Sequence, residues 1–338
     1  IRPLAYTLSN GSLVFASQIG SILSHLSVTA EIDPQGIFNY LYFHMVPSPG
    51  TIYRDIYKLQ PGEFLAYDKG KIKQQFYWQL GFSEAREAEK KLATQLRSEL
   101  EHSVGNCLSA RPTGTFLSGG LDSSTITGIF QGFSEEPIDA YVIGFDAEGF
   151  DEMPFARSSA HHFGATLHEY YVTPQDVLDA IPLISEAYDE PFGNASAIPT
   201  YYCARFAREQ GKNTLLAGDG GDEIFSGNAR YAKQKVFDLY RHIPSILKNV
   251  LIEPAASSLP PLKKLKSYIE QANIPMPERM ETYNFLHRSA LSEIFNKDFL
   301  DQIDTDSPLT LLNQQYERTD ISTPLVKKML FLDHKFTL

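Results

Sequence analysis

Residues 115–124, with the sequence TFLSGGLDSS, combine more residue types suited to chemistry than any other stretch of the chain. A short apolar run leads into Gly119 and Gly120, which lack Cβ atoms and let the backbone turn sharply and approach a ligand closely. The residues after the glycines predict a helix, whose free N–H groups and dipole would face that ligand and favour negative charge. Three serines add hydroxyl donors, so the stretch predicts an anion site.

Asp122 needs a separate explanation, because a carboxylate repels an anion unless a cation lies between them. The pattern therefore predicts a pyrophosphate site in which Asp122 holds Mg²⁺. The alternative is a tight strand-to-helix turn that serines cap and that binds nothing. The predicted pyrophosphate-binding residues are Ser118, Gly119, Gly120, Leu121, Asp122, Ser123 and Ser124.

A second junction between a strand and glycines carries three carboxylates within five positions. Residues 213–217 (NTLLA) read as a buried strand, and residues 218–223 (GDGGDE) follow it. Carboxylates this close raise one another's pKa unless cations or helix N-termini offset their charge. A solvated acidic turn is the alternative, although such a turn needs no glycines after an apolar strand. Asp122 and Asp222 are predicted to lie at the ends of two parallel strands, where doubly wound sheets bind ligands, and to share the metal.

The composition is that of an ordinary globular enzyme. The chain has 338 residues, of which 43% are hydrophobic and 21% charged, and its net charge is −11. Without a long Lys/Arg-rich run, the charge argues against nucleic acid or a membrane surface as partner. No signal peptide or 18-residue apolar run is present in this sequence, so a cytoplasmic location is expected. Cys107 and Cys203 lack metal-ligand spacing and are both expected to be reduced core residues.

Apolar strands and helical patterns alternate from residue 113 to residue 217, which predicts an α/β fold with a doubly wound, mostly parallel sheet. The strands are expected at 113–117, 138–145, 167–171 and 213–217. The helices are expected at 82–108, 123–132, 153–163, 177–186 and 200–211.

The two ends of the chain differ from this central part. Residues 1–80 predict short strands and two helices, with a Pro-rich connector between them, and residues 236–338 predict helices separated by Pro-rich turns such as 258–261. The chain is therefore predicted to divide into residues 1–80, a central domain at 81–235 and a helical portion of that domain at 236–338.

The sequence SGGLDSS resembles the pyrophosphate loop of the N-type ATP pyrophosphatases. Together with residues 218–223 it resembles the synthetase domain of the glutamine-dependent asparagine synthetases, and the similarity covers most of residues 1–235. Residues 141–146 (YVIGFD) are similar to that family's next strand, and residues 189–201 are similar to its acceptor-side loop. The resemblance implies an adenine nucleotide alpha-hydrolase-like fold that uses ATP and Mg²⁺.

The resemblance also implies a mechanism. The carboxylate substrate attacks the α-phosphorus of ATP, which releases pyrophosphate, and ammonia then converts the acyl-adenylate to an amide. Asp219 stands where many family members carry a glutamate that is associated with ammonia attack, so it is the candidate catalytic residue, although its side chain is one methylene shorter. The backbone expected to meet adenine is that of Phe116, Leu117, Ile143, Ala217 and Gly218.

Residues 1–80 resemble the end of that family's N-terminal glutaminase domain and the linker behind it. That domain begins with a cysteine nucleophile, whereas this sequence begins with Ile1, so the chain as given is expected not to hydrolyse glutamine. A free-standing small β subdomain is the alternative. The family's important lysine lies just beyond the kind of helix that ends this sequence, and none of Lys327, Lys328 and Lys335 matches its motif.

The sequence leaves three functions open. The first is the amidation of aspartate to asparagine with ammonia from glutamine. The second is the same adenylation of another carboxylate, as in the amidation of cell-surface sugars or the closure of a β-lactam ring. The third is a degenerate relative that binds nucleotide without turnover. Residues 193–196 (GNAS) carry no basic side chain for a second substrate carboxylate, and Ser226 and Asn228 replace the family's usual glycine and tyrosine. The oligomeric state stays open, with a homodimer as one arrangement.

Overall fold

The computed structural model divides the chain into two compact units, which are described separately. The parallel-sheet unit comprises Ser83–Tyr188 and Asn194–Asp222, and the mixed unit comprises Ile1–Phe82, Asp189–Gly193 and Glu223–Leu338. The residues that the structure describes are 3–82, 87–108, 111–146, 151–254, 263–282, 284, 286, 290–319 and 323–336. Within these ranges no helix is both long enough and apolar enough to cross a membrane.

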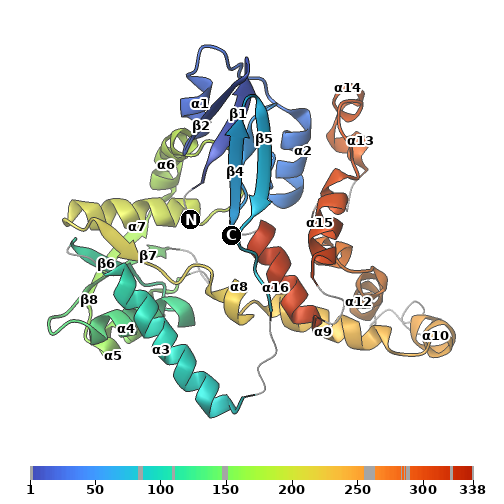
Figure 1. Ribbon diagram of the computed structural model, residues 1–338. Coiled ribbons are helices and arrows are strands. Elements are labelled where there is room, and N and C mark those ends of the chain that lie inside the picture. Colours follow the sequence, from blue (N-terminus) through green and yellow to red (C-terminus); the bar gives the residue numbers. More distant parts are fainter. Residues whose placement is uncertain are drawn as a thin grey trace. The chain divides into compact units, whose positions relative to one another are not determined.

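Four parallel strands form the sheet of the parallel-sheet unit, in the spatial order β8-β7-β6-β9 (Figure 1). The strands are β6 (Thr113–Phe116), β7 (Asp139–Phe145), β8 (Thr166–Val172) and β9 (Thr214–Leu216). The order of strands in the chain reverses between β6 and β9. In doubly wound folds such a reversal opens a crevice at the carboxyl ends of the strands, and ligands bind there.

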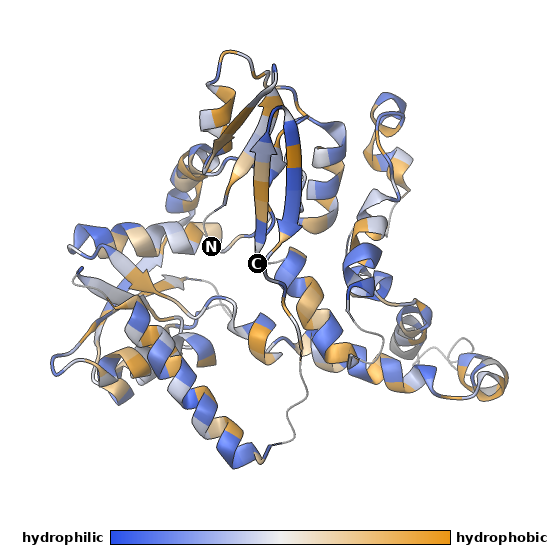
Figure 2. Ribbon diagram, in the orientation of Figure 1, coloured by the Kyte–Doolittle hydropathy of each residue, from blue (hydrophilic) through white to orange (hydrophobic). Residues whose placement is uncertain are grey.

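The helices of this unit are α3 (Glu89–Cys107), α4 (Leu121–Gly132), α5 (Met153–Phe163), α6 (Pro174–Ala187) and α7 (Ala197–Glu209). Four of them follow strands of the sheet, and α3 precedes the first strand and contacts α4. Figure 2 shows α3 largely in hydrophilic colours, with apolar residues at intervals, as the helical pattern predicts. The first residues of the predicted helix, 83–86, lie outside the described residues.

The core lies on both faces of the sheet, because side chains along a strand alternate in direction. On one face Tyr141 and Ile143 of β7 pack with Tyr202 of α7. On the other face Val142 of the same strand packs with Met153 of α5. Each predicted strand and helix of this unit is present, within a few residues at its ends except at the start of α3, which begins at Glu89 rather than at residue 82; the described residues 82, 87 and 88 are not helical. The doubly wound α/β fold is therefore confirmed.

The two cysteines have different environments. Cys203 is buried in the core, where burial raises the pKa of its thiol to about 12. Cys107, the last residue of α3, is exposed. The expectation of a core position is therefore wrong for Cys107, because α3 contacts the unit through only part of its length and buries only Val104.

The mixed unit contains two small antiparallel sheets, β2-β1-β3 and β4-β5, together with helices from both ends of the chain. Its strands are β1 (Ala5–Ser9), β2 (Ser12–Ala16), β3 (Tyr57–Lys58), β4 (Glu63–Asp68) and β5 (Lys71–Phe76). Its first helices are α1 (Ile19–Leu23), α2 (Pro34–Phe43), α8 (Gly221–Phe225, which begins in the other unit), α9 (Ala229–Arg241), α10 (Ser245–Leu247) and the π-helix η1 (Lys248–Ile252). They are followed by α12 (Lys263–Asn273), the 3₁₀ helix η3 (Glu278–Glu281), α13 (Leu291–Ile294), α14 (Lys297–Leu300), α15 (Ser307–Glu317) and α16 (Leu325–Phe336).

Residues from the two ends of the chain share a core in this unit. Phe43 at the end of α2 stacks on Phe336 of α16, with ring centroids 4.8 Å apart. Phe38 contacts Phe295 edge to face at 5.8 Å, and the Asn284 amide donates to the Tyr42 carbonyl. The sequence placed these segments in separate parts, and the boundaries at 80 and 235 stay a prediction. The Pro-rich turn at 258–261 lies outside the described residues.

A buried acidic cluster joins α9, η3 and α16. Asp333 of α16 accepts hydrogen bonds from the Tyr231 hydroxyl and from Arg230, whose Nη2 lies 2.6 Å from Oδ2. Glu281 is 91% buried beside this pair, and burial raises its pKa to about 7. The nearby Arg230 charge favours the ionised form of Glu281 and Asp333 opposes it, so burial decides the direction.

Glu281→Gln is expected to stabilise the protein at high pH. Because the folded-state pKa is raised, the cost of ionising Glu281 is present above about pH 7 and disappears as the pH falls toward the unfolded value. The expected gain is about 3 kcal/mol at pH 8 and less than about 1 kcal/mol at pH 5. Denaturant unfolding at the two pH values measures it. The exposed control Glu293→Gln should change stability by less than about 0.5 kcal/mol at both pH values. An equal gain from Glu281→Gln at both pH values would contradict the raised pKa of Glu281.

Candidate functional site

The loops that follow β6 and β9 flank the point where the strand order reverses. Residues 117–120 leave β6, and residues 217–220 leave β9, its parallel neighbour. The structure thus brings together the two segments that the sequence singled out, which lie about a hundred positions apart, at the edge where such folds bind ligands.

Serine hydroxyls fix the shape of the first loop. The Ser118 and Ser123 Oγ atoms lie 2.9 Å apart, and Ser123 Oγ also accepts from the Ser118 N–H at 3.2 Å. Ser118 Oγ in turn accepts from the Gly120 N–H at 3.3 Å. This network closes the loop over the first turn of α4, whose leading N–H groups have no carbonyl of their own helix to bond. These hydrogen bonds fix the shape of the loop at the start of α4, where the sequence predicts the pyrophosphate site.

Gly119 is required for this shape in two ways. Its φ is +85°, a value that only glycine adopts without strain. A Cβ atom at this position would also lie 2.5 Å from the Ala156 N atom and 2.7 Å from the Phe155 carbonyl carbon of α5. Gly119 therefore lets the loop lie directly against the α5 backbone.

The second loop packs onto the start of α4. A Cβ atom on Gly218 would lie 2.6 Å from the Ser123 N atom and 2.7 Å from the carbonyl carbon of Asp122. A Cβ atom on Gly221 would lie 2.5 Å from the Asp122 carboxyl carbon. Glycines at these positions thus allow the acidic loop to approach the Asp122 side chain closely. This contact explains why the second loop needs glycines after its strand.

The Asp122 carboxyl group lies in an unfavourable electrostatic position. Burial raises its pKa, and the negative charge of Asp222 raises it further. Two carboxylates that repel each other beside an anion cradle suit Mg²⁺, which is commonly held by one or two carboxylates together with substrate phosphates and water. Among the described residues, no three His, Cys, Asp or Glu side chains converge on one point.

The residues predicted to meet adenine are divided between the two faces of the sheet. Phe116 and Ile143 belong to the same core cluster. Leu117 is buried in the opposite cluster and donates its N–H to the Tyr141 carbonyl at 2.8 Å, so its side chain does not share their face. Ala217 is exposed at the end of β9. This arrangement leaves backbone atoms and the face of Phe116 and Ile143 as the surface that a base could contact.

The remaining predicted residues lie at the same edge of the sheet. Asp219 and Asp222 are exposed on the loop after β9, and Leu121 opens α4 with its side chain in solvent. Ser124 Oγ lies 3.0 Å from Ser159 Oγ of α5, a partner that the sequence analysis missed. No local pattern marks Ser159, since it is one of several serines on a helix.

The turn between α8 and α9 explains one departure from the resembling family. Asn228 is the N-cap of α9, and its Oδ1 accepts from the Arg230 N–H at 3.0 Å. This hydrogen bond satisfies one of the unpaired donors at the helix start. Ser226 has a φ of +61°, which strains a residue that carries a Cβ atom.

Ser226→Gly is expected to stabilise the protein by about 0.5–1 kcal/mol, because glycine relieves the left-handed strain but loses more conformational entropy on folding. Ser226→Ala keeps the Cβ atom and should give no gain. Urea unfolding of both variants measures the difference. Equal stability of the two variants would contradict backbone strain at Ser226.

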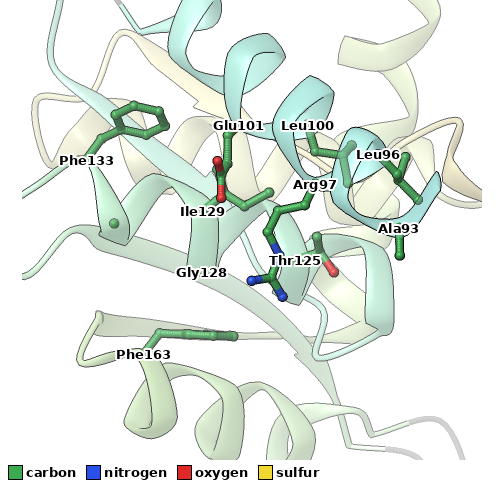
Figure 3. Close-up of a pocket in the computed structure, with 11 residues that line it drawn as sticks. Ala93, Leu96, Arg97, Leu100, Glu101, Thr125, Gly128, Ile129, Phe133 and Phe163 are labelled. Carbon is green, nitrogen blue, oxygen red and sulfur yellow. The ribbon is translucent and has the colours of Figure 1, made fainter. Parts of the chain in front are cut away.

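A pocket of about 730 Å³ lies elsewhere in the same unit, between α3 and α4, with Phe163 of α5 at one side (Figure 3). Its lining is mainly apolar, and Figure 3 shows Arg97 reaching toward Thr125. The Thr125 hydroxyl already donates to the Leu121 carbonyl at 2.8 Å. The pocket carries neither a carboxylate pair nor a helix N-terminus, so the candidate site remains at the two loops.

Comparison with known proteins identifies the family of the chain. The asparagine synthase family model matches residues 95–335, and the glutamine amidotransferase domain model matches residues 1–78. The glutamine-hydrolyzing asparagine synthetase 1 of Bacillus subtilis (strain 168) is 31% identical over 281 residues, which is 82% of this chain and 44% of that protein. A putative glutamine-hydrolyzing asparagine synthetase 2 of Methanocaldococcus jannaschii is 32% identical over 271 residues, 78% of this chain and 51% of that protein.

The chain therefore spans about half the length of these curated relatives. A solved NH3-dependent NAD synthetase from Campylobacter jejuni is 13% identical in sequence. Its alignment covers 70% of this chain and 98% of that protein chain, with a TM-score of 0.29. The asparagine synthase family model covers both loops of the site and most of the chain. By that match, the chain belongs to the asparagine synthase family.

Proposed function

We propose that this protein takes part in the ATP-dependent amidation of a carboxylate, with release of AMP and pyrophosphate. The observation that carries the proposal is the contact between the two loops. The Ser118–Ser123 cradle and the acidic loop after β9 meet at Asp122, where anion-binding N–H groups and a carboxylate pair lie together. Family membership supports the same chemistry, because the curated relatives are named asparagine synthetases.

The proposed reaction assigns a task to each part of the site. The N–H groups at the start of α4 and the serine hydroxyls bind the β- and γ-phosphates and keep the α-phosphorus accessible. A carboxylate oxygen of the substrate forms a bond to that phosphorus while the bond to the pyrophosphate oxygen breaks. Ammonia then attacks the acyl carbon, loses a proton, and AMP leaves. Positioning and neutralisation of charge supply most of the rate in this type of transfer.

Asp122 and Asp222 are the residues that would hold Mg²⁺. The ion would neutralise charge on the phosphates when it is bound with ATP. Asp219, exposed beside them, is the candidate to take the proton that ammonia loses. A base has to reach the proton within hydrogen-bond distance. Because the Asp219 side chain is one methylene shorter than that of glutamate, the intermediate would have to lie close to the loop after β9.

Aspartate is the proposed acceptor, because the curated relatives are asparagine synthetases. One observation favours a different carboxylate. Residues 188–200, which precede and begin α7, contain neither lysine nor arginine to bind a second carboxylate. An amidation of a substrate with a single carboxylate, by the same adenylation, is therefore the second candidate function.

Product analysis tests the proposal. The gene product that carries this chain is incubated with Mg-ATP, ammonia and a panel of carboxylates that includes aspartate, and nucleotides are separated by chromatography. AMP with equimolar pyrophosphate in the presence of aspartate supports the first candidate, and the same products with only another carboxylate support the second. ADP with phosphate would contradict both. ATP binding without turnover would point to a degenerate relative.

A further inference from the structure

A cavity of about 350 Å³ is present within the mixed unit, where α9 packs against α12 and α16 (Figure 1). All the described residues that line it belong to this unit. Its polar and basic lining consists of Arg230, Lys233, Gln234, Gln271 and Thr282, and two methionines complete it. The volume is at the lower end of the range of about 300–1,000 Å³ that is usual for small-molecule sites.

Lys233 brings a positive charge to this cavity without a carboxylate to balance it. Its Nζ donates to Gln271 Oε1 at 2.9 Å and lies 5.3 and 5.2 Å from the ring centroids of Phe237 and Tyr268. In the described part of the chain no Asp or Glu side chain forms an ion pair with it. An ammonium group has three N–H donors, so two remain after the bond to the glutamine.

A second cation lies directly behind the lining. The Arg279 side chain is fully buried, and its Nε donates to Gln234 Oε1 at 2.7 Å and its Nη1 to the Ala272 carbonyl at 3.3 Å. Its Nη2 has no hydrogen-bond partner among the residues that the structure describes. Burial lowers the pKa of Arg279, and Arg241 lowers it more than Asp238 raises it. A buried guanidinium without a carboxylate partner is costly.

The two buried carboxylates of this part of the unit do not balance these charges. Asp333 already pairs with Arg230. Burial raises the pKa of Glu281 to about 7, so this side chain is ionised only in part at neutral pH. Three cations, which include Lys233 and Arg279, therefore face less than two full negative charges. An anion in the cavity would reduce this imbalance.

The two glutamines of the lining offer further donors in a defined orientation. Arg279 holds Gln234 by its Oε1, and the Gln234 Nε2 makes only a long contact of 3.4 Å with the Arg279 carbonyl. Gln271 accepts from Lys233 with its Oε1 and donates from Nε2 to Ser267 Oγ at 3.2 Å. A cation thus fixes which end of each amide carries the N–H groups. Each amide nitrogen has two N–H donors, so each keeps at least one for a ligand.

We propose that this cavity binds a small organic anion, whose carboxylate or phosphate group lies against Lys233 and the amide N–H groups of Gln234 and Gln271. Both groups offer only acceptors when they are fully ionised, which suits a lining that combines free donors with excess positive charge. Met280 and Met329 are buried and adaptable, and would contact the carbon part of the ligand. The site is additional to the two loops and does not rest on the proposed function.

The test is a titration of the gene product that carries this chain, without ATP and at constant ionic strength, by isothermal calorimetry. Inorganic phosphate and succinate are the two probes, and the one that binds more tightly identifies the anionic group. Lys233→Met keeps the apolar stem but removes the charge, and should weaken binding by about tenfold or more. Gln271→Leu removes one amide donor and should weaken it by about threefold or more.

Lys235→Met is the matched control, because Lys235 is an exposed lysine of the same helix that does not line the cavity. Its affinity should stay within about twofold of the parent, since exposed charges are screened by salt. If the parent binds neither probe, the inference is wrong. Binding that Lys233→Met leaves unchanged belongs to another part of the protein and also overturns it. Should Lys233→Met not fold, an unchanged affinity of Gln271→Leu would contradict the proposal in the same way.

Discussion

Asp122→Asn is expected to lower the rate of AMP and pyrophosphate release by roughly 10²–10³-fold, the range found when one electrostatic contact to a transition state is removed. The substitution keeps the size of the side chain but removes the charge that would hold Mg²⁺ beside the phosphates. Folding should not suffer, since burial and Asp222 both disfavour the ionised Asp122 carboxyl group in the protein without ligand. The melting temperature should therefore be equal to that of the parent or higher.

Asp179→Asn is the matched control for this variant. Asp179 is an exposed carboxylate on α6 of the same unit, and its Oδ1 accepts from the Gln175 amide at 2.8 Å. An asparagine at that position can still accept this bond, so neither rate nor stability should change. Turnover by Asp122→Asn at the parent rate would show that Asp122 does not act at the metal.

Gly119→Ala is expected to destabilise the parallel-sheet unit by roughly 2–5 kcal/mol, the sum of the left-handed strain and the overpacking of a close contact. The φ of +85° disfavours any Cβ atom, and the added methyl group would meet the α5 backbone at Ala156, which cannot rotate away as a side chain can. The loop would have to move away from α5, so AMP release should fall together with stability. Urea unfolding and the product assay measure the two effects.

Gly132→Ala provides the comparison. Gly132 is the last residue of α4, and a Cβ atom there would have no neighbour within 4 Å. Alanine is the better helix former, so this change should be neutral or stabilising by up to about 1 kcal/mol. Similar stability of the two alanine variants would contradict the close packing of the first loop on α5.

The sequence predicted the parallel-sheet unit well because its signals are local. The strands are short runs rich in threonine, aliphatic and aromatic residues. The helices that follow have clear hydrophobic periodicity, so the doubly wound fold and the place of both loops could be expected. The pairing of Asp122 with Asp222 was also predictable, since parallel strands in such a fold end at the same edge. The raised pKa of Asp122 agrees with that proximity.

Contacts between distant segments could not be predicted in the same way. Asp189 caps α1, Glu190 pairs with Lys58, and Phe43 stacks on Phe336, and nothing in the neighbouring sequence of these residues indicates a partner. Short elements were missed for a related reason. β3 has two residues and is a strand only because it pairs with β1. A strand of this length has no periodicity of its own.

The most direct test of the central claim follows oxygen from the substrate to the nucleotide. The protein is supplied with Mg-ATP, ammonia and the carboxylate that supports turnover, labelled with ¹⁸O in the reacting group, and the AMP is analysed by mass spectrometry. If the carboxylate attacks the α-phosphorus, one labelled oxygen stays on phosphorus when ammonia displaces AMP, so each AMP carries one ¹⁸O atom. Label in inorganic phosphate with ADP as the product, or unlabelled AMP, would contradict the adenylation that these two loops are proposed to perform.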